Sequence, residues 1–446
     1  MNTPIYDFVR AYTAQNALRL HMPGHKGASL LGCEKLDITE IEGADSLYHA
    51  NGIILESEKN ASSIFGTAHT FYSTEGSSLC IRAMLCLIKR YADALGAAPR
   101  ILAGRNAHKT FITAAALLGI EVDWLYPENG SYLACQIDAD KLDAILSASE
   151  AKPTAVYLTS PDYLGNVSDV AEISRVCRAH GVLLAVDNAH GAYLKLLSPS
   201  RHPIDLGADI CCDSAHKTLP VLTGGAYLHI SKNAPSLFAD GARSALSLFG
   251  STSPSYLILE SLDLANRYIS EGYPERLSEF VRQLDALKAR LSDMGFALMG
   301  NEPLKLTISA REIGYTGDGL AFEIAKRGGV CEFSDPDFTV MMLTPELCED
   351  GLQRLERILS DIKICEPLKK TKLELPRPKS IISPQKALFS DSEELSVDAC
   401  EGRIQAEASV SCPPAVPIVV CGEEIDGASV KMLKYYGIKK CRVVKK

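Results

Sequence analysis

The chain has 446 residues, of which 46% are hydrophobic and 23% are charged, and its mean hydropathy is +0.03. This length predicts more than one domain, and this composition is ordinary for a soluble globular protein. A net charge of −9 leaves no basic excess to neutralise phosphates, so nucleic acid is not an expected partner. The sequence shows neither a signal-peptide pattern nor an apolar run that could span a membrane, and we expect a cytoplasmic protein.

The 14 cysteines include no C-x-x-C pair, and several lie inside apolar runs, as at Cys86, Cys177 and Cys211-Cys212. Thiols in such runs behave as small buried hydrophobes in a reducing compartment. Because paired cysteine knuckles are absent, the sequence predicts no metal site.

Residues 1–50 are rich in glycine, histidine and turn formers and predict an N-terminal arm with a loop. A large domain over residues 51–266 follows, in which β-branched runs alternate with amphipathic segments such as Leu79–Tyr91. A second helix is expected over Asp169–His180, where Ser168 is a good N-cap and Gly181 a good C-terminal residue.

The helix Asp169–His180 lies between two apolar runs that predict strands, Ala155–Thr159 and Val182–Val186, and Ile210–Cys212 predicts another. Strand, helix and strand in this order, with apolar strands, predict parallel βαβ units covered on both faces. Ligands gather at the carboxyl ends of such strands.

A charged amphipathic helix from about residue 267 to 295 leads into a smaller α/β domain over 267–367. Leu304–Ile308 and Val340–Leu343 are its predicted strands. A stretch rich in Lys and Pro predicts a linker over 368–384, and a C-terminal module over 385–446 follows it.

The segment Ser73–Ser78 places Gly76, Ser77 and Ser78 directly before a predicted helix. Free N–H groups and the helix dipole favour an anion at a helix N-terminus, so a phosphate could bind there. An ordinary helix cap explains the same residues equally well.

Asp187 ends a predicted strand in the segment Val186–Gly191. A carboxylate at this place could pair with a pyridinium nitrogen and keep it protonated, so that the ring accepts electrons. The alternative is an aspartate that only caps the next turn.

Lys217 follows the next apolar strand in the segment Asp213–Thr218. A buried lysine loses its charge more readily, which an amine that attacks an aldehyde requires. Ser214 and His216 on either side can hold a phosphate. The three segments together predict that Lys217 binds pyridoxal 5′-phosphate (PLP) as a Schiff base.

The order of motifs along the chain resembles the Orn/Lys/Arg (group III) basic amino-acid decarboxylases, in their short form without an N-terminal wing domain. The resemblance runs nearly end to end. The segments that carry it are His21–Gly27, Phe65–Phe71, Arg105–Lys109, Thr159–Gly165, Val186–Gly191, Ser214–Pro220, Gly250–Tyr256, Glu401–Ile404 and Pro413–Ile418.

The resemblance implies an α/β protein of PLP fold type I, the aspartate-aminotransferase type. Its large domain would hold a mostly parallel seven-stranded sheet, followed by a small α/β domain and a C-terminal appendage. The implied reaction is decarboxylation of arginine, lysine or ornithine to the amine and CO2, through a Lys217 aldimine and a quinonoid. The resemblance also implies a homodimer or larger homo-oligomer with shared active sites.

The resemblance assigns roles to matching residues. Lys217 would form the aldimine, Asp187 would pair with the pyridinium, and His108 would stack on the cofactor. His190 would lie near the cofactor and the reacting carboxylate, and His216 or Lys217 would donate a proton. The cofactor-binding set implied is Gly76, Ser77, Ser78, His108, Asp187, His190, Ser214, His216 and Lys217, with Ser251 or Thr252 reaching the phosphate of the neighbouring subunit.

The sequence departs from the family pattern at Glu75, Asp162, Thr223–Gly225 and Cys421-Gly422. These departures keep two alternatives open: another fold-type I enzyme, such as an aminotransferase or aldolase, and a catalytically silent PLP-binding homologue. A basic substrate side chain calls for an acidic partner, and Glu332 and Asp335 are candidates.

Overall fold

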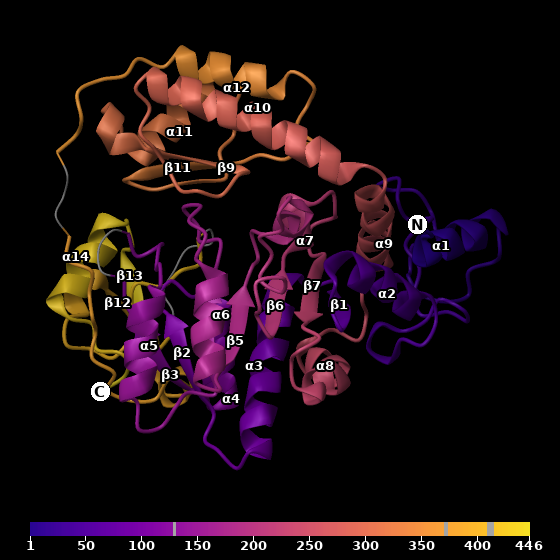
Figure 1. Cartoon of the computed structure of the whole chain (residues 1–446), viewed down its shortest axis with the longest axis horizontal. Coiled ribbons are helices and arrows are strands. Elements are labelled where there is room, and N and C mark those ends of the chain that lie inside the picture. The colour runs from indigo at the N-terminus through magenta and orange to yellow at the C-terminus, as the bar shows by residue number, and fades with distance from the viewer. Residues whose placement is uncertain (128–130, 370–372, 408–413) are drawn as a thin grey trace. The chain divides into compact units, whose positions relative to one another are not determined.

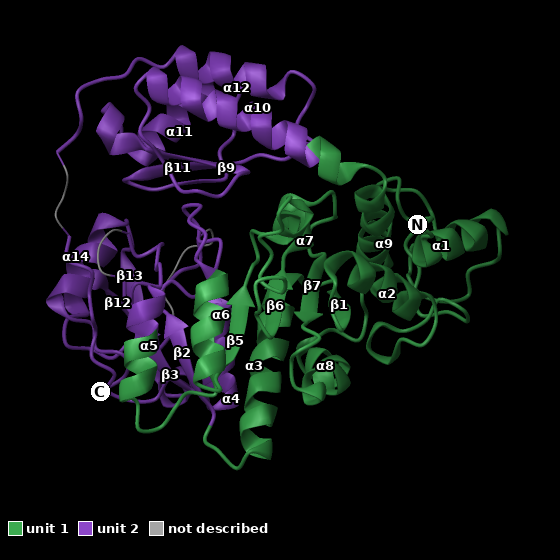
Figure 2. Cartoon of the chain, in the orientation of Figure 1, with its two compact units in different colours: residues 1–98, 143–157, 170–276 green, residues 99–142, 158–169, 277–446 purple. Residues whose placement is uncertain are grey.

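The structure, a computed structural model, describes residues 1–127, 131–369, 373–407 and 414–446 (Figure 1). Residues 370–372 of the predicted linker and Pro413 of the last family motif lie outside these ranges. The chain divides into two compact units, which Figure 2 colours separately. Unit 1 comprises residues 1–98, 143–157 and 170–276, and unit 2 comprises residues 99–142, 158–169 and 277–446. The predicted domain boundaries stay predictions.

The large sheet has seven strands in the order β1-β7-β6-β5-β4-β2-β3. The neighbours β5 and β6 are parallel, as are β2 and β3, while β7 is antiparallel to both β1 and β6. The predicted mostly parallel sheet and fold class are confirmed. The strands are β1 His69–Ser73, β2 Arg100–Gly104, β3 Glu121–Leu125, β4 Ala155–Thr159, β5 Leu183–Asp187, β6 Ile210–Asp213 and β7 Ala226–Ile230.

Unit 1 is built from buried strands and amphipathic helices. Every residue of β5, β6 and β7 is buried, which explains why β5 and β6 are recognisable in the sequence as apolar runs. Helix α6 turns Val170, Ile173 and Val176 inward. The helices are α1 Pro4–Ala14, α2 Ile53–Phe65, α3 Gly76–Ala94, α6 Val170–Ala179, α7 Ala215–Thr218, α8 Ser236–Phe249 and α9 Tyr256–Ser270, with 3₁₀ turns at Leu47–His49 and Ala192–Leu196.

Unit 2 contains a four-stranded antiparallel sheet in the order β10-β11-β9-β8. Helices α10 and α12 lie over one face of it (Figure 1), and their leucines form a core with β9. The elements of this sheet and its cover are β8 Leu298–Met299, β9 Lys305–Ser309, β10 Phe333–Ser334, β11 Phe338–Met342, α10 Tyr273–Asp293 (which begins in unit 1), α11 Gly317–Lys326, α12 Gly351–Ser360 and a 3₁₀ turn at Ala310–Ile313.

The C-terminal part of unit 2 pairs β12 with β13 in an antiparallel ribbon that packs with α14 around its own small core. Its elements are α13 Pro384–Leu388, β12 Ser392–Ser396, α14 Gly427–Tyr435, β13 Lys440–Val444 and a 3₁₀ turn at Val397–Ala399. Unit 2 also holds α4 Lys109–Leu118, and α5 Ala139–Ala148 runs across the boundary of the two units.

The charged helix expected from about residue 267 to 295 is present as α10, but it begins later than expected, because α9 occupies the first residues of this stretch. Helix α9 ends at Ser270 and α10 begins at Tyr273. Gly272 between them has φ +81°, a left-handed conformation that stops a helix and that glycine adopts at least cost. Among the helices within the described ranges, none has the length and apolar character needed to cross a membrane.

Candidate functional site

The carboxyl ends of β5 and β6 bring the predicted site residues of unit 1 together. The two strands are parallel neighbours, with Asp187 opposite Cys212 in the register. Asp187 is the last residue of β5, and Ser214 follows the last residue of β6. The short helix α7 comes next and carries Lys217.

Lys217 and His190 form a hydrogen-bonded pair. The Lys217 Nζ lies 2.9 Å from His190 Nε2. His190 is buried with 6% of its surface exposed, three residues beyond Asp187 in the turn that leaves β5. An imidazole nitrogen at this distance can accept a proton from the lysine ammonium, which is the change that makes the amine a nucleophile.

Asp187 is buried, with 3% of its surface exposed. The Tyr157 hydroxyl donates to its Oδ2 at 3.2 Å, and the Ala189 N–H donates to Oδ1, also at 3.2 Å. The Cys212 thiol points to Oδ1 at 3.7 Å. Burial raises the pKa of Asp187, and the nearby charge of Lys217 opposes the rise only in part. A further cation beside this carboxylate would lower the cost of keeping it ionised.

The N-terminus of α3 faces the start of α7. The Ser214 hydroxyl donates to Ser77 Oγ at 2.8 Å. Gly76, the first residue of α3, has φ +71°, and a Cβ built on it would have no atom within 4 Å. The Gly76 N–H donates to the Gly224 oxygen at 2.7 Å. Open space beside a helix N-terminus and two hydroxyls suits an anion. Ser78 follows in the same first turn and is half-buried.

His216 is held by a backbone carbonyl. Its Nδ1 lies 3.0 Å from the Gly225 oxygen, and burial lowers its pKa. Because a carbonyl only accepts, Nδ1 carries the proton of the neutral ring and Nε2 is left as an acceptor.

His108 lies in unit 2, where it is the N-cap of α4. Its Nδ1 accepts the Thr110 N–H at 3.1 Å, so at least one function of this ring is structural. Ser251 and Thr252 are exposed, and the Ser251 N–H donates to Glu75 Oε1 at 2.6 Å. The cofactor roles of these three residues stay predictions.

Two departures from the family pattern have local structural explanations. Asp162 is 3% exposed and closes its own loop: Oδ1 accepts the N–H groups of Leu164 and Asn166 at 2.9 Å each. Its carboxylate is therefore occupied within the loop. Gly224 has φ +102°, and a Cβ there would meet the Thr74 carbonyl at 2.8 Å, so a larger residue would push the chain away from the start of α3.

Sequence reasoning missed the residues that surround Asp187 and Asp213. Asp213 lies at the end of β6, where Oδ2 accepts from His202 Nε2 at 3.0 Å and from His229 Nε2 at 3.1 Å. Asn188 donates to its Oδ1 at 2.7 Å. His202, Cys211 and Asp213 also form a group whose possible metal-ligand atoms lie within 4.8 Å of one another. The two imidazoles already occupy the hydrogen-bonding positions of Asp213 Oδ2, the oxygen that a metal ion would need.

The described residues of unit 1 fit PLP. A buried carboxylate short of compensating charge suits a protonated ring nitrogen, and the space at Gly76 beside Ser77 and Ser214 suits a phosphate. Lys217 supplies the amine that an aldehyde needs. These groups belong to one compact unit.

The fold is that of the PLP-dependent enzymes of fold type I. Lysine decarboxylase A from Pseudomonas aeruginosa matches it with a TM-score of 0.80 at 17% identity, over 99% of this chain and 80% of that one. The constitutive lysine decarboxylase of E. coli matches with a TM-score of 0.76 at 17% identity, over 100% of this chain and 82% of that one.

Sequence comparison gives the family. Residues 3–300 match the family model for the Orn/Lys/Arg decarboxylase major domain, and residues 370–441 match that for the C-terminal domain. The uncharacterized protein YaaO of Bacillus subtilis is 30% identical over 97% of this chain and 94% of its own length. An arginine decarboxylase of Halalkalibacterium halodurans is 27% identical over 97% and 93%. The chain belongs to the Orn/Lys/Arg decarboxylase family and is a decarboxylase, which confirms the predicted resemblance.

Proposed function

We propose that the protein decarboxylates arginine, lysine or ornithine to the corresponding amine and CO2, with PLP bound at Lys217. The observation that carries this proposal is the pair of Lys217 and His190 beside the buried Asp187, in a member of this family. The half-buried lysine, its buried proton acceptor and a buried carboxylate for the ring nitrogen lie together, which a silent homologue would not require.

Asp187 would hold the ring nitrogen of PLP, while the N-terminus of α3 and the hydroxyls of Ser77, Ser78 and Ser214 would hold its phosphate. When bound, PLP supplies an aldehyde that takes up the substrate amine and a ring that accepts the electron pair released when CO2 leaves. His108 is the proposed stacking residue.

The residues around Lys217 would control its protons. His190 Nε2 accepts a proton from Lys217 Nζ across 2.9 Å, which leaves a neutral amine. His216 is neutral near pH 7 because burial lowers its pKa, and its Nε2 can take and return a proton. Either His216 or Lys217 would return the proton that replaces the carboxylate on the substrate carbon.

Release of CO2 tests the function against its alternatives. The purified protein with PLP is mixed separately with arginine, lysine and ornithine, each with and without a 2-keto acid as amino acceptor, and CO2, amine and keto acid are all measured. We expect CO2 and amine in equal amounts from at least one of the three. Keto acid without CO2 would replace the proposal with an aminotransferase, and no turnover with any amino acid of a full panel would leave a silent homologue.

We propose further that the protein is at least a homodimer. The N-terminal arm exposes four large apolar side chains that a partner could cover: Leu18 (83%), Leu20 (85%), Leu30 (84%) and Leu31 (89%). The exposed segment Ser251–Ser253 is the proposed contact to the partner's phosphate. Light scattering should give twice the monomer mass or more, and a fully active monomer would contradict the shared site.

A further inference from the structure

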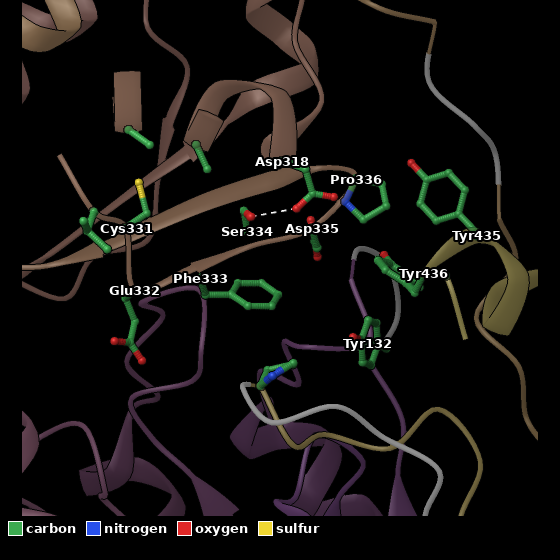
Figure 3. Close-up of a pocket in the computed structure, with 15 residues that line it drawn as sticks. Tyr132, Asp318, Cys331, Glu332, Phe333, Ser334, Asp335, Pro336, Tyr435 and Tyr436 are labelled. Atoms are coloured by element: carbon green, nitrogen blue, oxygen red, sulfur yellow. Dashed lines mark hydrogen bonds between the residues drawn. The ribbon is translucent and has the colours of Figure 1, made fainter. Parts of the chain in front are cut away.

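Unit 2 contains a cavity of about 540 Å³ that the predicted PLP site does not use. It is lined by residues of α11, β10 and its flanking loops, the end of α14, and Tyr132 (Figure 3). This volume is within the range of small-molecule sites, and the cavity lies among residues of a single compact unit.

The described lining of this cavity carries negative charge only. Its fifteen residues include the carboxylates of Asp318, Glu332 and Asp335, and no lysine, arginine or histidine. The Ser334 hydroxyl donates to Asp318 at 2.7 Å, and the Tyr163 hydroxyl donates to Glu332 at 3.0 Å. Both partners are neutral, so these hydrogen bonds leave the negative charge uncompensated.

Asp335 is the most confined of the three carboxylates, with 6% of its surface exposed. Its Oδ1 accepts the N–H groups of Asp337 and Phe338, each at 2.7 Å. Its Oδ2 is buried and, among the described residues, has no hydrogen-bond partner. Burial, together with the charges of Asp337 and Asp318, raises the pKa of Asp335 to about 7. A buried acceptor without a donor is costly, and a cationic ligand would supply the missing donor.

Four aromatic side chains also line the cavity. Tyr132 and Tyr436 lie edge to face with ring centroids 4.7 Å apart, and Tyr435 is 5.1 Å from Tyr436. Phe333 is on the opposite side, and Figure 3 shows Asp335 and these rings bordering the same space. Aromatic faces attract ammonium groups and cover methylene chains, so the walls complement the carboxylates.

We propose that this cavity binds an alkyl diamine or polyamine, an organic cation that lacks a carboxylate. Aromatic walls and this volume suit a chain of methylene groups with ammonium ends better than a hydrated metal ion, which needs several oxygen ligands. The sequence offers Glu332 and Asp335 as partners for an amino acid's basic side chain, but an amino acid also brings a carboxylate. The described lining offers that carboxylate no cation, so the cavity favours the amine. The inference does not depend on the reaction at Lys217.

Calorimetric titration of the full-length protein with 1,4-diaminobutane, spermidine, lysine and arginine tests the proposal. The protein is titrated in parallel after borohydride reduction of its Lys217–PLP imine, because the resulting secondary amine cannot react with an added amine. We expect saturable binding of the two amines to both proteins, and at least tenfold weaker binding of the two amino acids. In Asp335→Asn the affinity for the amines should fall about tenfold or more, because a charge-assisted hydrogen bond is lost.

Asparagine keeps the oxygen that accepts the two backbone N–H groups, so Asp335→Asn should fold, and an unchanged melting temperature checks this. The matched control is Glu349→Gln, which removes the same charge from an exposed residue of unit 2 outside the cavity. Amine binding that is equal in Asp335→Asn and the wild type, or lost equally in Glu349→Gln, would overturn the proposal. So would a wild type that binds no amine, or that binds lysine as tightly as 1,4-diaminobutane.

Discussion

Strands β5 and β6 end side by side in two buried aspartates with different electrostatic surroundings. At Asp213 burial alone would raise the pKa, but His202 and His229 donate hydrogen bonds to Oδ2 and hold the pKa well below its usual value. At Asp187 the donors are a tyrosine hydroxyl, a backbone amide and a thiol, and burial raises the pKa. The charge of Asp213 is compensated by side chains of the protein itself, whereas Asp187 is suited to a cation supplied by a ligand.

Asp213 and Asp187, the proposed cofactor ligand, differ on physical grounds. Both residues are almost fully buried, so burial alone does not distinguish them. The difference is in the donors: imidazole N–H groups for Asp213, and a hydroxyl, a thiol and one amide for Asp187. Substitutions at the ends of β5 and β6 should therefore have different effects, on turnover at one and on stability at the other.

The largest expected effect is that of Lys217→Ala. Without the amine the protein has no group to bind the PLP aldehyde, and turnover should fall by about four orders of magnitude or more. The visible absorption of lysine-bound PLP should disappear in the same variant. Lys232→Ala, which removes an exposed lysine, is the control and should keep full activity. Covalent trapping of PLP by borohydride in Lys217→Ala would contradict the assignment.

Asp213→Asn should act on stability. The change removes the charge between two buried imidazoles, and breaking such a group costs roughly 3 kcal/mol, or a fall in melting temperature of about 3–6 °C for a chain of this length. The folded pKa of Asp213 is lowered below 3.8, so its contribution is present above about pH 4 and is lost as the pH falls below that value. In the variant, this pH-dependent contribution to the free energy of unfolding should be absent. Near-normal kcat of the folded variant at low temperature would confirm a structural role, and a large loss of kcat with unchanged melting would refute it.

Asp187→Asn should act on turnover. If Asp187 keeps a ring nitrogen protonated, its loss should lower kcat and kcat/KM together by about two orders of magnitude, or roughly 3 kcal/mol, with little change in KM. The folded pKa of Asp187 is raised, so ionising the buried carboxylate above pH 3.8 costs stability, and the asparagine removes that cost. The melting temperature without cofactor should stay the same or rise. A normal kcat with a lowered melting temperature would indicate that Asp187 only caps the following turn.

The sequence predicted the residues of the two strand ends but not what surrounds them. Asp187, Lys217 and His190 follow apolar strands in short motifs, and parallel strands bring their carboxyl ends to one edge. Tyr157 and His229 come from β4 and β7. Which strands flank β5 and β6 depends on long-range pairing, and no local pattern states it.

The surroundings of the unit 2 cavity were even less predictable from the sequence. The sequence singled out Glu332 and Asp335, but as isolated acidic residues in a loop, where solvated charge is the ordinary explanation. The cavity that Asp335 borders is also lined by Tyr132 and by the end of α14, which are distant from Asp335 in the chain. Burial of a charge without a partner is a property of packing, and a sequence pattern does not reveal it.

The smallest effect is expected at Ser214, which follows Asp213 directly and is therefore positioned by the end of β6. Its hydroxyl donates to Ser77 Oγ and is a proposed phosphate ligand. Ser214→Ala should weaken PLP binding by about tenfold, since one such hydrogen bond is worth roughly 1–1.5 kcal/mol. At saturating PLP the kcat should change little, because the phosphate is remote from the bond that breaks and its binding is uniform along the reaction.

Titration of the cofactor-free variant with PLP measures this affinity. Ser247→Ala is the control, because that serine is exposed on α8 and its hydroxyl donates to a carbonyl of its own helix. Unchanged PLP affinity with a lowered kcat would mean that Ser214 acts on the reacting groups and not on the phosphate. Residues at the end of β6 would then take part in the reaction as directly as those at the end of β5.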